Sequence, residues 1–290
     1  MKRILITGAT GNIGKEIIRF LFESGTEMKI VAGVRDILKA RMVFEKYPGL
    51  EYVQFDFEDI ASFETSLDSI DSLFLLRPPH ISDVPKYFYP LIKKISEKGI
   101  KEIIFLSVQG AEKSKVIPHN KIEKLIRESG LDFIFIRPSY FMQNLTTTLI
   151  EDIRERRKII LPAGNARFNW IDIVNIGETT AILLKRFEEF RGMEIEITGS
   201  ENLSFSEVTK IINETNNTQI TFESPNPLSF YLAKRREGHP SGLILVMILL
   251  HFLPRFQKEP EISDFYFRLT GKKPTIIEDF AKRERQLFVE

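Results

Sequence analysis

An apolar run near the start of the chain leads directly into three glycines, Gly8, Gly11 and Gly14, spaced three residues apart. The stretch MKRILITGATGNIGKE combines a predicted strand at Arg3–Thr7 with a predicted helix that starts at Ile13. Glycine permits a tight turn, a close approach of a ligand to the backbone, and close packing of the helix on the strand. Free N–H groups at the helix start would face a diphosphate, which the helix dipole also favours. The feature predicts a dinucleotide site, with a tight turn that holds no ligand as the alternative.

Short β-branched apolar runs alternate with longer amphipathic segments over much of the chain. The predicted strands are Arg3–Thr7, Met28–Val34, Leu50–Phe55, Ser72–Leu76, Glu102–Ser107, Phe133–Arg137 and Glu194–Thr198. The predicted helices between them include Ile13–Ser24, Pro85–Lys98 and His119–Ser129. The first five strands recur at intervals typical of βαβ units, and each is apolar enough to be buried on both faces. We therefore predict an α/β fold, a Rossmann-like doubly wound parallel sheet with helices on both faces.

The strand–helix pattern weakens after residue 200. Ser204 and Glu207 stand at the spacing of a capping box, as do Thr275 and Glu278, so each pair predicts a helix start. Proline and glycine break the intervening segment into mostly helical pieces. We expect residues 1–200 to form the nucleotide-binding domain. Residues 201–290 should form a small, mainly helical C-terminal substrate lobe over the carboxyl ends of the strands, interleaved with the first domain rather than cleanly separable.

The apolar run SGLILVMILLHFLP, Ser241–Pro254, raises the question of membrane insertion. A helix of about 12 residues would extend roughly 18 Å, well short of the roughly 30 Å hydrocarbon core of a bilayer. The sequence predicts a buried helix here, or one that lines a pocket, rather than a membrane span.

Composition excludes several classes of function. The chain carries 41 Lys and Arg against 40 Asp and Glu, so no basic field points to nucleic acid. It has no cysteine, which excludes disulfides, thiolate metal sites and a cysteine nucleophile and fits a cytoplasmic protein. The N-terminus lacks the pattern of a signal peptide. The four histidines show no metal-ligand spacing with carboxylates, and no G-x-S-x-G elbow indicates a hydrolase. We expect neither a metal nor a membrane partner, and a monomer or homodimer.

The end of the second predicted strand bears on which nucleotide is bound. An acidic residue at this strand's tip would bind the ribose 2′-hydroxyl of NAD, but the chain has Arg35 there, with Lys39 one helical turn later. A guanidinium suits a 2′-phosphate, so NADP(H) is preferred. Asp36 keeps NAD(H) possible, and an exposed strand end without a ligand is the alternative for Arg35. After the third strand, Asp56 and Phe57 are placed to meet the adenine, although Asp56 could equally cap the next helix.

At this point the motifs resemble those of the NmrA-like family of atypical short-chain dehydrogenase/reductases. The matching segments are TGATGNIG, VR, QFDFED, FLSVQGA, HNKIEKLIRESGLDFIFIRPSYFMQNL, RFNWIDIVNIGETTAILL and RLTGKKPTIIEDFAKR. They cover almost the whole chain. The resemblance implies a Rossmann-like domain that binds NADP(H), with a small C-terminal substrate lobe. The family includes quinone reductases, relatives of isoflavone reductase and redox-sensing regulators that bind the nucleotide without turning it over.

The resemblance also implies which residues contact the cofactor. They lie in the glycine turn and after each of the next four strands: Gly8, Thr10, Gly11, Asn12, Ile13, Gly14, Arg35, Asp56, Phe57, Leu76, Arg77, Pro78, Ser107, Val108 and Gln109.

The proton donor of the wider superfamily is missing from this sequence. That superfamily uses a tyrosine and a lysine four residues apart, the lysine lowering the pKa of the tyrosine. Here the tyrosine position falls on Lys115 and the lysine position on His119, or on Lys121 if the register shifts by two. A histidine in this place resembles the quinone-reductase subgroup, in which water can protonate the product oxygens. His119 is the predicted catalytic residue, with a pKa near neutrality, or else a helix-start residue with a capping role.

An aromatic cluster follows the sixth predicted strand and the next apolar turn. Its members, with one amide, are the predicted substrate-pocket residues Tyr140, Phe141, Asn144, Phe168 and Trp170. An aromatic wall suits a flat, apolar ligand, but each of these rings could equally belong to the core. Arg137 is expected to be a buried structural partner for a carboxylate such as Asp172 rather than a substrate ligand.

Two classes of function remain open from the sequence. The first is an NADPH-dependent oxidoreductase that reduces a small apolar electrophile such as a quinone, supported by His119 and the aromatic cluster. The second is a non-catalytic NADP(H)-binding redox sensor that acts through a protein partner, supported by the missing tyrosine–lysine pair. A regulator that binds DNA alone fits poorly, since the charge is balanced and no helix-turn-helix is visible.

Overall fold

The computed structural model describes residues 1–289 and divides into two compact units. Unit 1 comprises Met1–Pro138 and Ile173–Ile197, and unit 2 comprises Ser139–Asp172 and Thr198–Glu290. The chain passes from one unit to the other three times, so the units are interleaved in sequence. Residue 197 lies near the domain boundary expected at residue 200, whereas Ser139–Asp172 joins the unit that holds the C-terminal part of the chain.

Unit 1 is built on a seven-stranded sheet with the order β10-β6-β5-β4-β1-β2-β3. Every neighbouring pair in this sheet is parallel. The strands are β1 (Arg3–Thr7), β2 (Lys29–Val34), β3 (Glu51–Gln54), β4 (Ser72–Leu76), β5 (Glu102–Leu106), β6 (Asp132–Pro138) and β10 (Glu194–Ile197). The order reverses direction between β1 and β4, and folds of this kind bind ligands at the carboxyl ends of the strands on either side of such a reversal. The predicted Rossmann-like α/β fold is confirmed.

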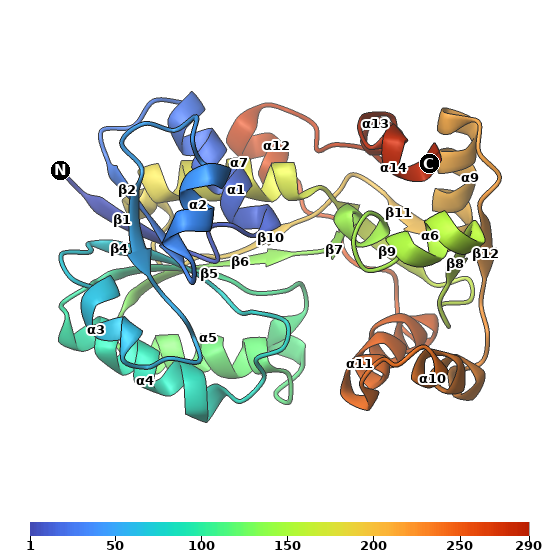
Figure 1. Cartoon of the computed structure of the whole chain (residues 1–290), viewed down its shortest axis with the longest axis horizontal. Coiled ribbons are helices and arrows are strands. Elements are labelled where there is room, and N and C mark those ends of the chain that lie inside the picture. The colour runs from blue at the N-terminus through green and yellow to red at the C-terminus, as the bar shows by residue number, and fades with distance from the viewer. Residues whose placement is uncertain (290) are drawn as a thin grey trace. The chain divides into compact units, whose positions relative to one another are not determined.

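Helices cover both faces of this sheet, as Figure 1 shows. They are α1 (Asn12–Glu23), α2 (Ile37–Val43), α3 (Ser62–Ser66), α4 (Val84–Glu97), α5 (Pro118–Glu128), α7 (Ile173–Lys185) and α8 (Phe187–Phe190), with a 3₁₀ turn η1 at Ala111–Lys113. In α1 the buried residues are Gly14, Ile17, Ile18 and Leu21, the spacing of one helix face. Helices α1 and α7 pack together on one face of the sheet. Helices α3, α4 and α5 pack with the strands in a core on the other.

A buried ion-pair network ties β6 to α5. Arg137 is almost fully buried, and its Nε and Nη2 atoms donate to the two carboxylate oxygens of Glu123 at 2.9 and 2.7 Å. Glu194 on β10 lies 2.7 Å and Glu112 lies 3.2 Å from the same guanidinium. Arg137 is thus a structural residue, as expected, but the partner suggested from sequence is wrong. Asp172 instead accepts from Arg283 at 2.6 Å in unit 2.

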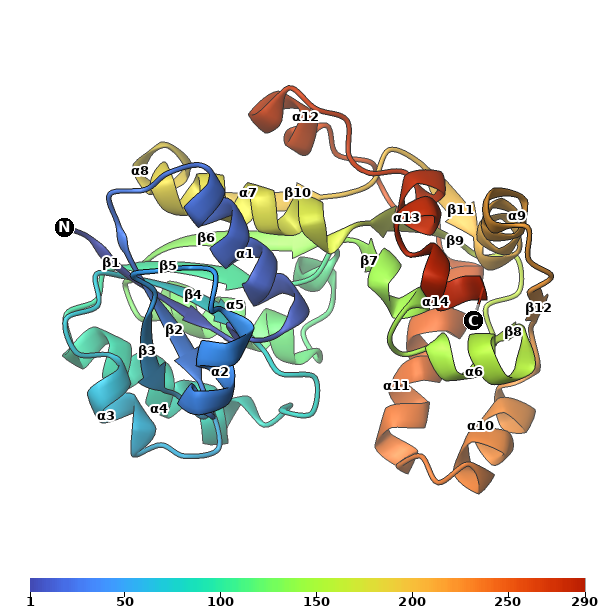
Figure 2. The ribbon, with the colours of Figure 1, turned by 45° about the horizontal axis from the view of Figure 1, so that its top comes forward.

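Unit 2 contains two small sheets. In the first, β11 (Asn202–Ser204) runs antiparallel to β9 (Arg167–Ile171), and β7 (Tyr140–Phe141) runs parallel to it. In the second, β12 (Thr221–Glu223) pairs in parallel with β8 (Lys158–Ile160). The helices are α6 (Ile150–Arg156), α9 (Phe205–Asn216), α10 (Pro227–Arg236), α11 (Ser241–Phe252), α12 (Phe265–Thr270), α13 (Ile277–Arg283) and α14 (Arg285–Val289), with 3₁₀ turns η2 (Met142–Leu145) and η3 (Leu253–Phe256). Figure 2 shows these elements from a second direction.

The two predicted capping boxes have different outcomes. Ser204 is the N-cap of α9, and its side chain and that of Glu207 cap each other's backbone, so this box is confirmed. Helix α13 begins after Ile276, so a helix starts at this place as predicted, while the box at Thr275 and Glu278 stays a prediction. The buried residues Ile277, Phe280 and Ala281 form the apolar face of this helix.

Helix α11 corresponds to the apolar run that raised the membrane question. The helix forms as predicted, but only Ile244 and His251 within it are buried, so the expected burial is wrong for most of its length. Within residues 1–289, no helix is long and apolar enough to cross a membrane.

Candidate functional site

The turn between β1 and α1 is shaped by its glycines. Gly8 has φ +60°, a conformation that side chains rarely adopt. Its carbonyl oxygen accepts the N–H of Gly11 at 2.9 Å. A Cβ atom at Gly14 would lie 2.4 Å from the Gly8 carbonyl oxygen and 2.7 Å from Ala9 Cα, so no side chain fits there. The helix start therefore lies directly against the turn, which presents its backbone to a ligand.

The N-terminus of α1 offers hydrogen-bond donors without competition from its own side chains. Its N-cap residue, Gly11, makes no side-chain cap, and the first turn contains no acidic residue. The first N–H groups of a helix have no partner within the helix, so they are available to an anion. Thr10 and Asn12 are exposed, and Ile13 is partly exposed, whereas Gly14 is buried under the turn.

Arg35 and Asp36 follow β2 and differ in how they are used. The Asp36 carboxylate caps α2 by accepting the N–H of Lys39 at 3.0 Å. The Arg35 side chain is exposed and forms no ion pair within residues 1–289. The carboxylate that could serve a ribose hydroxyl is thus occupied locally, and the guanidinium is available.

The side chains of Asp56 and Phe57, which follow β3, both make contacts within the protein. Asp56 accepts the N–H of Glu58 at 3.0 Å. Because the N-cap of α3 is Ala61, Asp56 shapes the turn and does not cap this helix. Phe57 is 6% exposed, and its ring lies 5.0 Å from that of Phe55 in the core. Its ring thus belongs to the core, and its contact with an adenine stays a prediction.

The loop after β4 is held in place by Arg77. Its Nη1 donates to the carbonyl oxygens of Pro78, Pro79 and Ile81, at 3.0, 3.1 and 2.7 Å. No carboxylate pairs with Arg77 within residues 1–289, and burial lowers the pKa of its guanidinium. Leu76, at the end of β4, packs against Gly8 across the turn. A partly buried cation without a counter-ion therefore lies at the carboxyl edge of the sheet.

After β5, the side chains of Ser107 and Gln109 bind neighbouring carboxylates. Ser107 donates to Glu123 at 2.6 Å, and Gln109 Nε2 donates to Glu196 at 2.9 Å. Val108, between them, is partly exposed. The predicted residues after β1, β2, β3, β4 and β5 thus follow the carboxyl ends of parallel strands, which meet at one edge. Whether each contacts a nucleotide stays a prediction.

His119 lies in the first turn of α5, next to Arg77. Arg77 Nε donates to His119 Nε2 at 3.4 Å, so Nε2 carries the lone pair and Nδ1 carries the proton. The imidazole also packs on Phe105, with ring centroids 6.2 Å apart. Burial, together with the charge of Arg77, lowers the pKa of His119 to about 3. The expected pKa near neutrality is wrong, and no side chain caps α5 at its N-cap, Ile117. His119 is a neutral imidazole with a proton on Nδ1.

The aromatic cluster predicted as a substrate wall belongs largely to the core of unit 2. Trp170 is 1% exposed and donates its indole N–H to the Leu203 carbonyl at 2.9 Å. Phe168 is also buried, in contact with Phe205. These two rings therefore do not form an open wall. The other three members are partly exposed and keep a substrate role only as a prediction: Tyr140, Phe141 and Asn144.

Sequence reasoning missed the pairing of Tyr140 with His251. His251 Nδ1 lies 2.6 Å from the Met247 carbonyl oxygen, which only accepts, so this nitrogen is protonated. Nε2 therefore accepts from the Tyr140 hydroxyl at 3.0 Å. Burial lowers the pKa of His251 to about 4 and raises that of Tyr140. The two residues are 111 positions apart, and no spacing rule links them.

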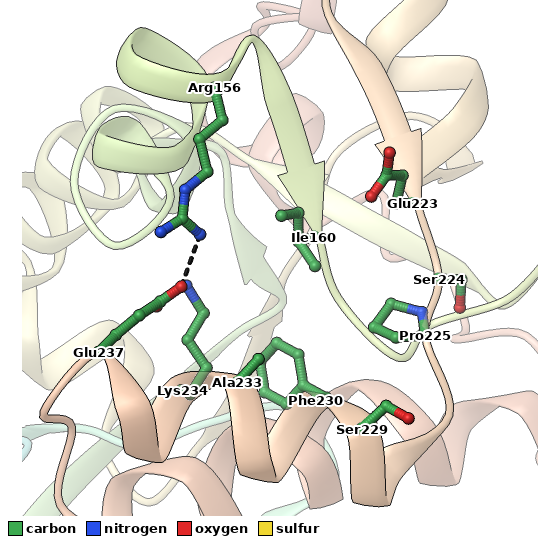
Figure 3. Close-up of a pocket in the computed structure, with 10 residues that line it drawn as sticks. All are labelled: Arg156, Ile160, Glu223, Ser224, Pro225, Ser229, Phe230, Ala233, Lys234 and Glu237. Carbon is green, nitrogen blue, oxygen red and sulfur yellow. Dashed lines mark hydrogen bonds and ion pairs between the residues drawn. The ribbon is translucent and has the colours of Figure 1, made fainter.

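A cavity of about 460 Å³ lies in unit 2 between α10 and the β8–β12 pair, away from every predicted site residue. Figure 3 shows Arg156 reaching toward the ends of Lys234 and Glu237, with Ile160 and Phe230 nearby. Lys234 pairs with Asp152 at 2.7 Å and with Glu237 at 2.8 Å, and Arg156 pairs with the same two carboxylates. These cations are neutralised by the protein, so they bind the elements of unit 2 together rather than an anionic ligand.

Comparison with known proteins agrees with the motifs. The model of the NmrA-like family matches residues 1–231, which confirms the resemblance. Prestalk A differentiation protein A of Dictyostelium discoideum is 31% identical over 282 residues, 96% of this chain and 91% of that protein. NAD(P)H azoreductase of Xenophilus azovorans is 25% identical over 289 residues, 98% of this chain and 99% of that protein. The solved complex of NADPH-dependent quinone oxidoreductase QOR2 from Escherichia coli with NADPH has the same fold, with a TM-score of 0.83 at 21% identity over 97% of this chain and 99% of that chain.

Proposed function

Because the chain belongs to the NmrA-like family, we propose that it is an NADPH-dependent oxidoreductase that reduces a small apolar electrophile such as a quinone. The observation that carries this proposal is the glycine turn. Gly14 leaves no room for a side chain, and no side chain caps the helix behind it. A backbone left open in this way at a helix N-terminus suits a diphosphate. The azoreductase and quinone oxidoreductase relatives point to the same class of reaction.

Arg35 supports a preference for NADP(H) over NAD(H). A 2′-phosphate is the group that an exposed guanidinium at this strand end would bind, through charge-assisted hydrogen bonds. Asp36 would be the residue for a free ribose hydroxyl, but its carboxylate caps α2. NAD(H) remains a possible second nucleotide, since a cap of this kind can be exchanged for another partner at modest cost.

His119 would act as a hydrogen-bond donor rather than as an acid. Its imidazole is neutral far below pH 7, and Arg77 occupies Nε2, which leaves the Nδ1–H to donate. Such a donor can hold a ribose hydroxyl or polarise a substrate oxygen. When bound, NADPH supplies the hydride, and water supplies the proton that completes reduction of a quinone to a hydroquinone. The missing tyrosine is then dispensable.

Oxidation of NADPH in the presence of a panel of quinones and aldehydes tests this proposal. We expect turnover above the uncatalysed rate with at least one quinone. His119→Ala should lower kcat about tenfold, below the usual contribution of general acid catalysis. The exposed His80 provides the matched control, and His80→Ala should leave the rate unchanged. If His119→Ala leaves turnover unchanged, the protein is still an oxidoreductase, but His119 takes no part in its reaction.

A redox sensor that binds NADP(H) without turnover is the second candidate. It is favoured by the relative at 31% identity, whose name refers to differentiation and not to a reaction. A sensor requires tight nucleotide binding, no turnover with any member of the panel, and a change in assembly between NADP⁺ and NADPH. Light scattering with each nucleotide, run beside the turnover assay, separates the two candidates.

A further inference from the structure

Helix α11 is apolar on both its buried and its exposed side. One face consists of Ile244, Met247, Ile248 and His251, which pack into unit 2 or lie partly buried against it. The opposite face is exposed, and its aliphatic side chains Leu243, Leu245, Val246, Leu249 and Leu250 each expose between 47% and 58% of their surface. A helix that is apolar all round is ordinarily buried. Helix α11 departs from this rule, because one of its two apolar faces is exposed.

Exposed apolar side chains continue on the neighbouring elements. Helix α10 packs on α11, and the two lie side by side in Figures 1 and 2. Leu228 and Leu232 stand one helical turn apart on α10 and are exposed, as are Leu253 and Phe256 in η3. Exposed apolar groups gathered on adjoining elements in this way mark a binding surface rather than ordinary surface variation.

Most of the cations around this apolar surface form no ion pair. Between residues 227 and 258 the chain has five Lys and Arg against one carboxylate, Glu237, and the exposed Glu259 and Glu261 follow this segment. Lys234 is buried in ion pairs. The other four cations are exposed and form no ion pair within residues 1–289: Arg235, Arg236, Arg255 and Lys258. The two pairs flank α11, one before its N-terminus and one after its C-terminus.

We propose that α10, α11 and η3 form a surface that docks on an anionic lipid bilayer. Helix α11 would lie in the plane of the interface with its exposed aliphatic face inserted at the headgroup boundary. The cations at its two ends would contact anionic headgroups. A helix in this orientation does not span the bilayer, so a length of 12 residues is sufficient. Apolar area and basic charge act together in such binding, and each cation near the surface contributes about fivefold in affinity.

A second copy of the chain fits this surface less well. Symmetric dimers place the same surface patch of one subunit against that of the other. Here that would bring the unpaired cations of the two copies close together, while Glu237, the carboxylate between α10 and α11, is engaged by Lys234 and Arg156. An anionic bilayer instead complements both the apolar face and the charge.

Co-sedimentation with phosphatidylcholine vesicles, with or without phosphatidylglycerol, tests the proposal on the full chain. We expect sedimentation that requires phosphatidylglycerol and weakens with salt. Leu245→Gln/Leu249→Gln should lower binding at least tenfold, since both exposed side chains would lose apolar contact. Arg235→Gln/Arg236→Gln should also lower it at least tenfold. Leu38→Gln/Met42→Gln on α2, at the same spacing and with exposed side chains, is the matched control and should change nothing.

A fluorescent label placed on the helix locates the contact. The chain has no cysteine, so Val246→Cys and Met42→Cys each give a single labelling position. An environment-sensitive label at Val246 should shift to the blue on anionic vesicles, while the label at Met42 should not. The proposal is overturned if the wild type stays in the supernatant with anionic vesicles, or if the protein sediments without a shift at Val246. It is also overturned if light scattering shows a dimer that Leu245→Gln/Leu249→Gln dissociates.

Discussion

Polar groups in the aromatic core of unit 2 are paired within the protein, whereas at the carboxyl edge of the unit 1 sheet two cations and a helix N-terminus have no anionic partner among residues 1–289. In unit 2, the Tyr140 hydroxyl donates to His251, and His251 donates to a backbone carbonyl. Asp172 likewise accepts from Gln143 and from Arg283, both at 2.6 Å. These groups are satisfied by the fold alone.

At the edge of the unit 1 sheet some donors have no such counterpart, although Ser107 and Gln109 pair with carboxylates. The N-terminus of α1 has no side-chain cap, and neither Arg35 nor Arg77 meets a carboxylate within residues 1–289. His119 and His251 both have lowered pKa values, yet only His119 lies beside such groups. The contrast between these two histidines shows that a lowered pKa alone does not identify a ligand site. Cations without a carboxylate partner, close to a helix N-terminus without a side-chain cap, are the stronger indication.

Gly14→Ala should have the largest effect on stability and on NADPH binding, because its side chain would disrupt the glycine turn at the edge of the unit 1 sheet. The new Cβ would meet the Gly8 carbonyl oxygen and Ala9 Cα, which are backbone atoms that cannot rotate away. We expect the free energy of unfolding to fall by about 3 kcal/mol, typical of severe overpacking. NADPH affinity should fall at least a hundredfold. Urea unfolding and calorimetric titration measure the two effects.

Gly242→Ala is the control for that substitution. A Cβ at Gly242 has nothing within 4 Å, and the residue lies in the first turn of α11. Stability should be unchanged or slightly higher, since alanine favours the helix. Equal losses for the two alanine variants would contradict the account of the turn.

Acid should weaken the core of unit 2 through His251. In the unfolded chain this histidine binds a proton near pH 6.5, whereas in the fold it does so near pH 4. Between these values the unfolded state holds the extra proton, so stability is complete above pH 6.5 and is lost as the pH falls. The loss is about 1.4 kcal/mol per pH unit for a histidine buried this deeply.

Urea unfolding at pH 7 and pH 5 measures this contribution. Tyr140→Phe/His251→Leu removes the titrating group together with its donor, so its stability should fall less between the two pH values than that of the wild type. His80 is exposed, and His80→Gln should leave the pH dependence as it is. A double variant as acid-sensitive as the wild type would mean that His251 is not the group that titrates.

The fold of unit 1 could be predicted from the sequence because its signals are local. Most of its strands are apolar runs buried on both faces, although the edge strand β3 is only partly buried, and β1 and β4 have the bounds that were predicted. The glycine turn is largely local as well, since the nearest atoms that leave no room for a side chain at Gly14 belong to Gly8 and Ala9. Periodicity and spacing report such contacts directly.

Unit 2 could be predicted less well because its contacts are distant in sequence. Tyr140 meets His251 across 111 residues, and Arg283 meets Asp172 across the same separation. The exposure of α11 was missed because periodicity cannot tell a buried face from an exposed one when both are apolar. At the site, the contact between Arg77 and His119 is also long-range, and it adds to the burial that lowers the pKa of His119, which was expected near neutrality.

Titration of NADPH and NADH into the wild type and Arg35→Ala tests most directly the central claim, that the open edge of unit 1 is an NADP(H) site. We expect NADPH to bind the wild type more tightly than NADH does. We also expect Arg35→Ala to lower NADPH affinity about tenfold, the effect of losing one exposed charge-assisted contact, and to leave NADH affinity unchanged. Tighter binding of NADH by the wild type, or an NADPH affinity that Arg35→Ala does not alter, would contradict it.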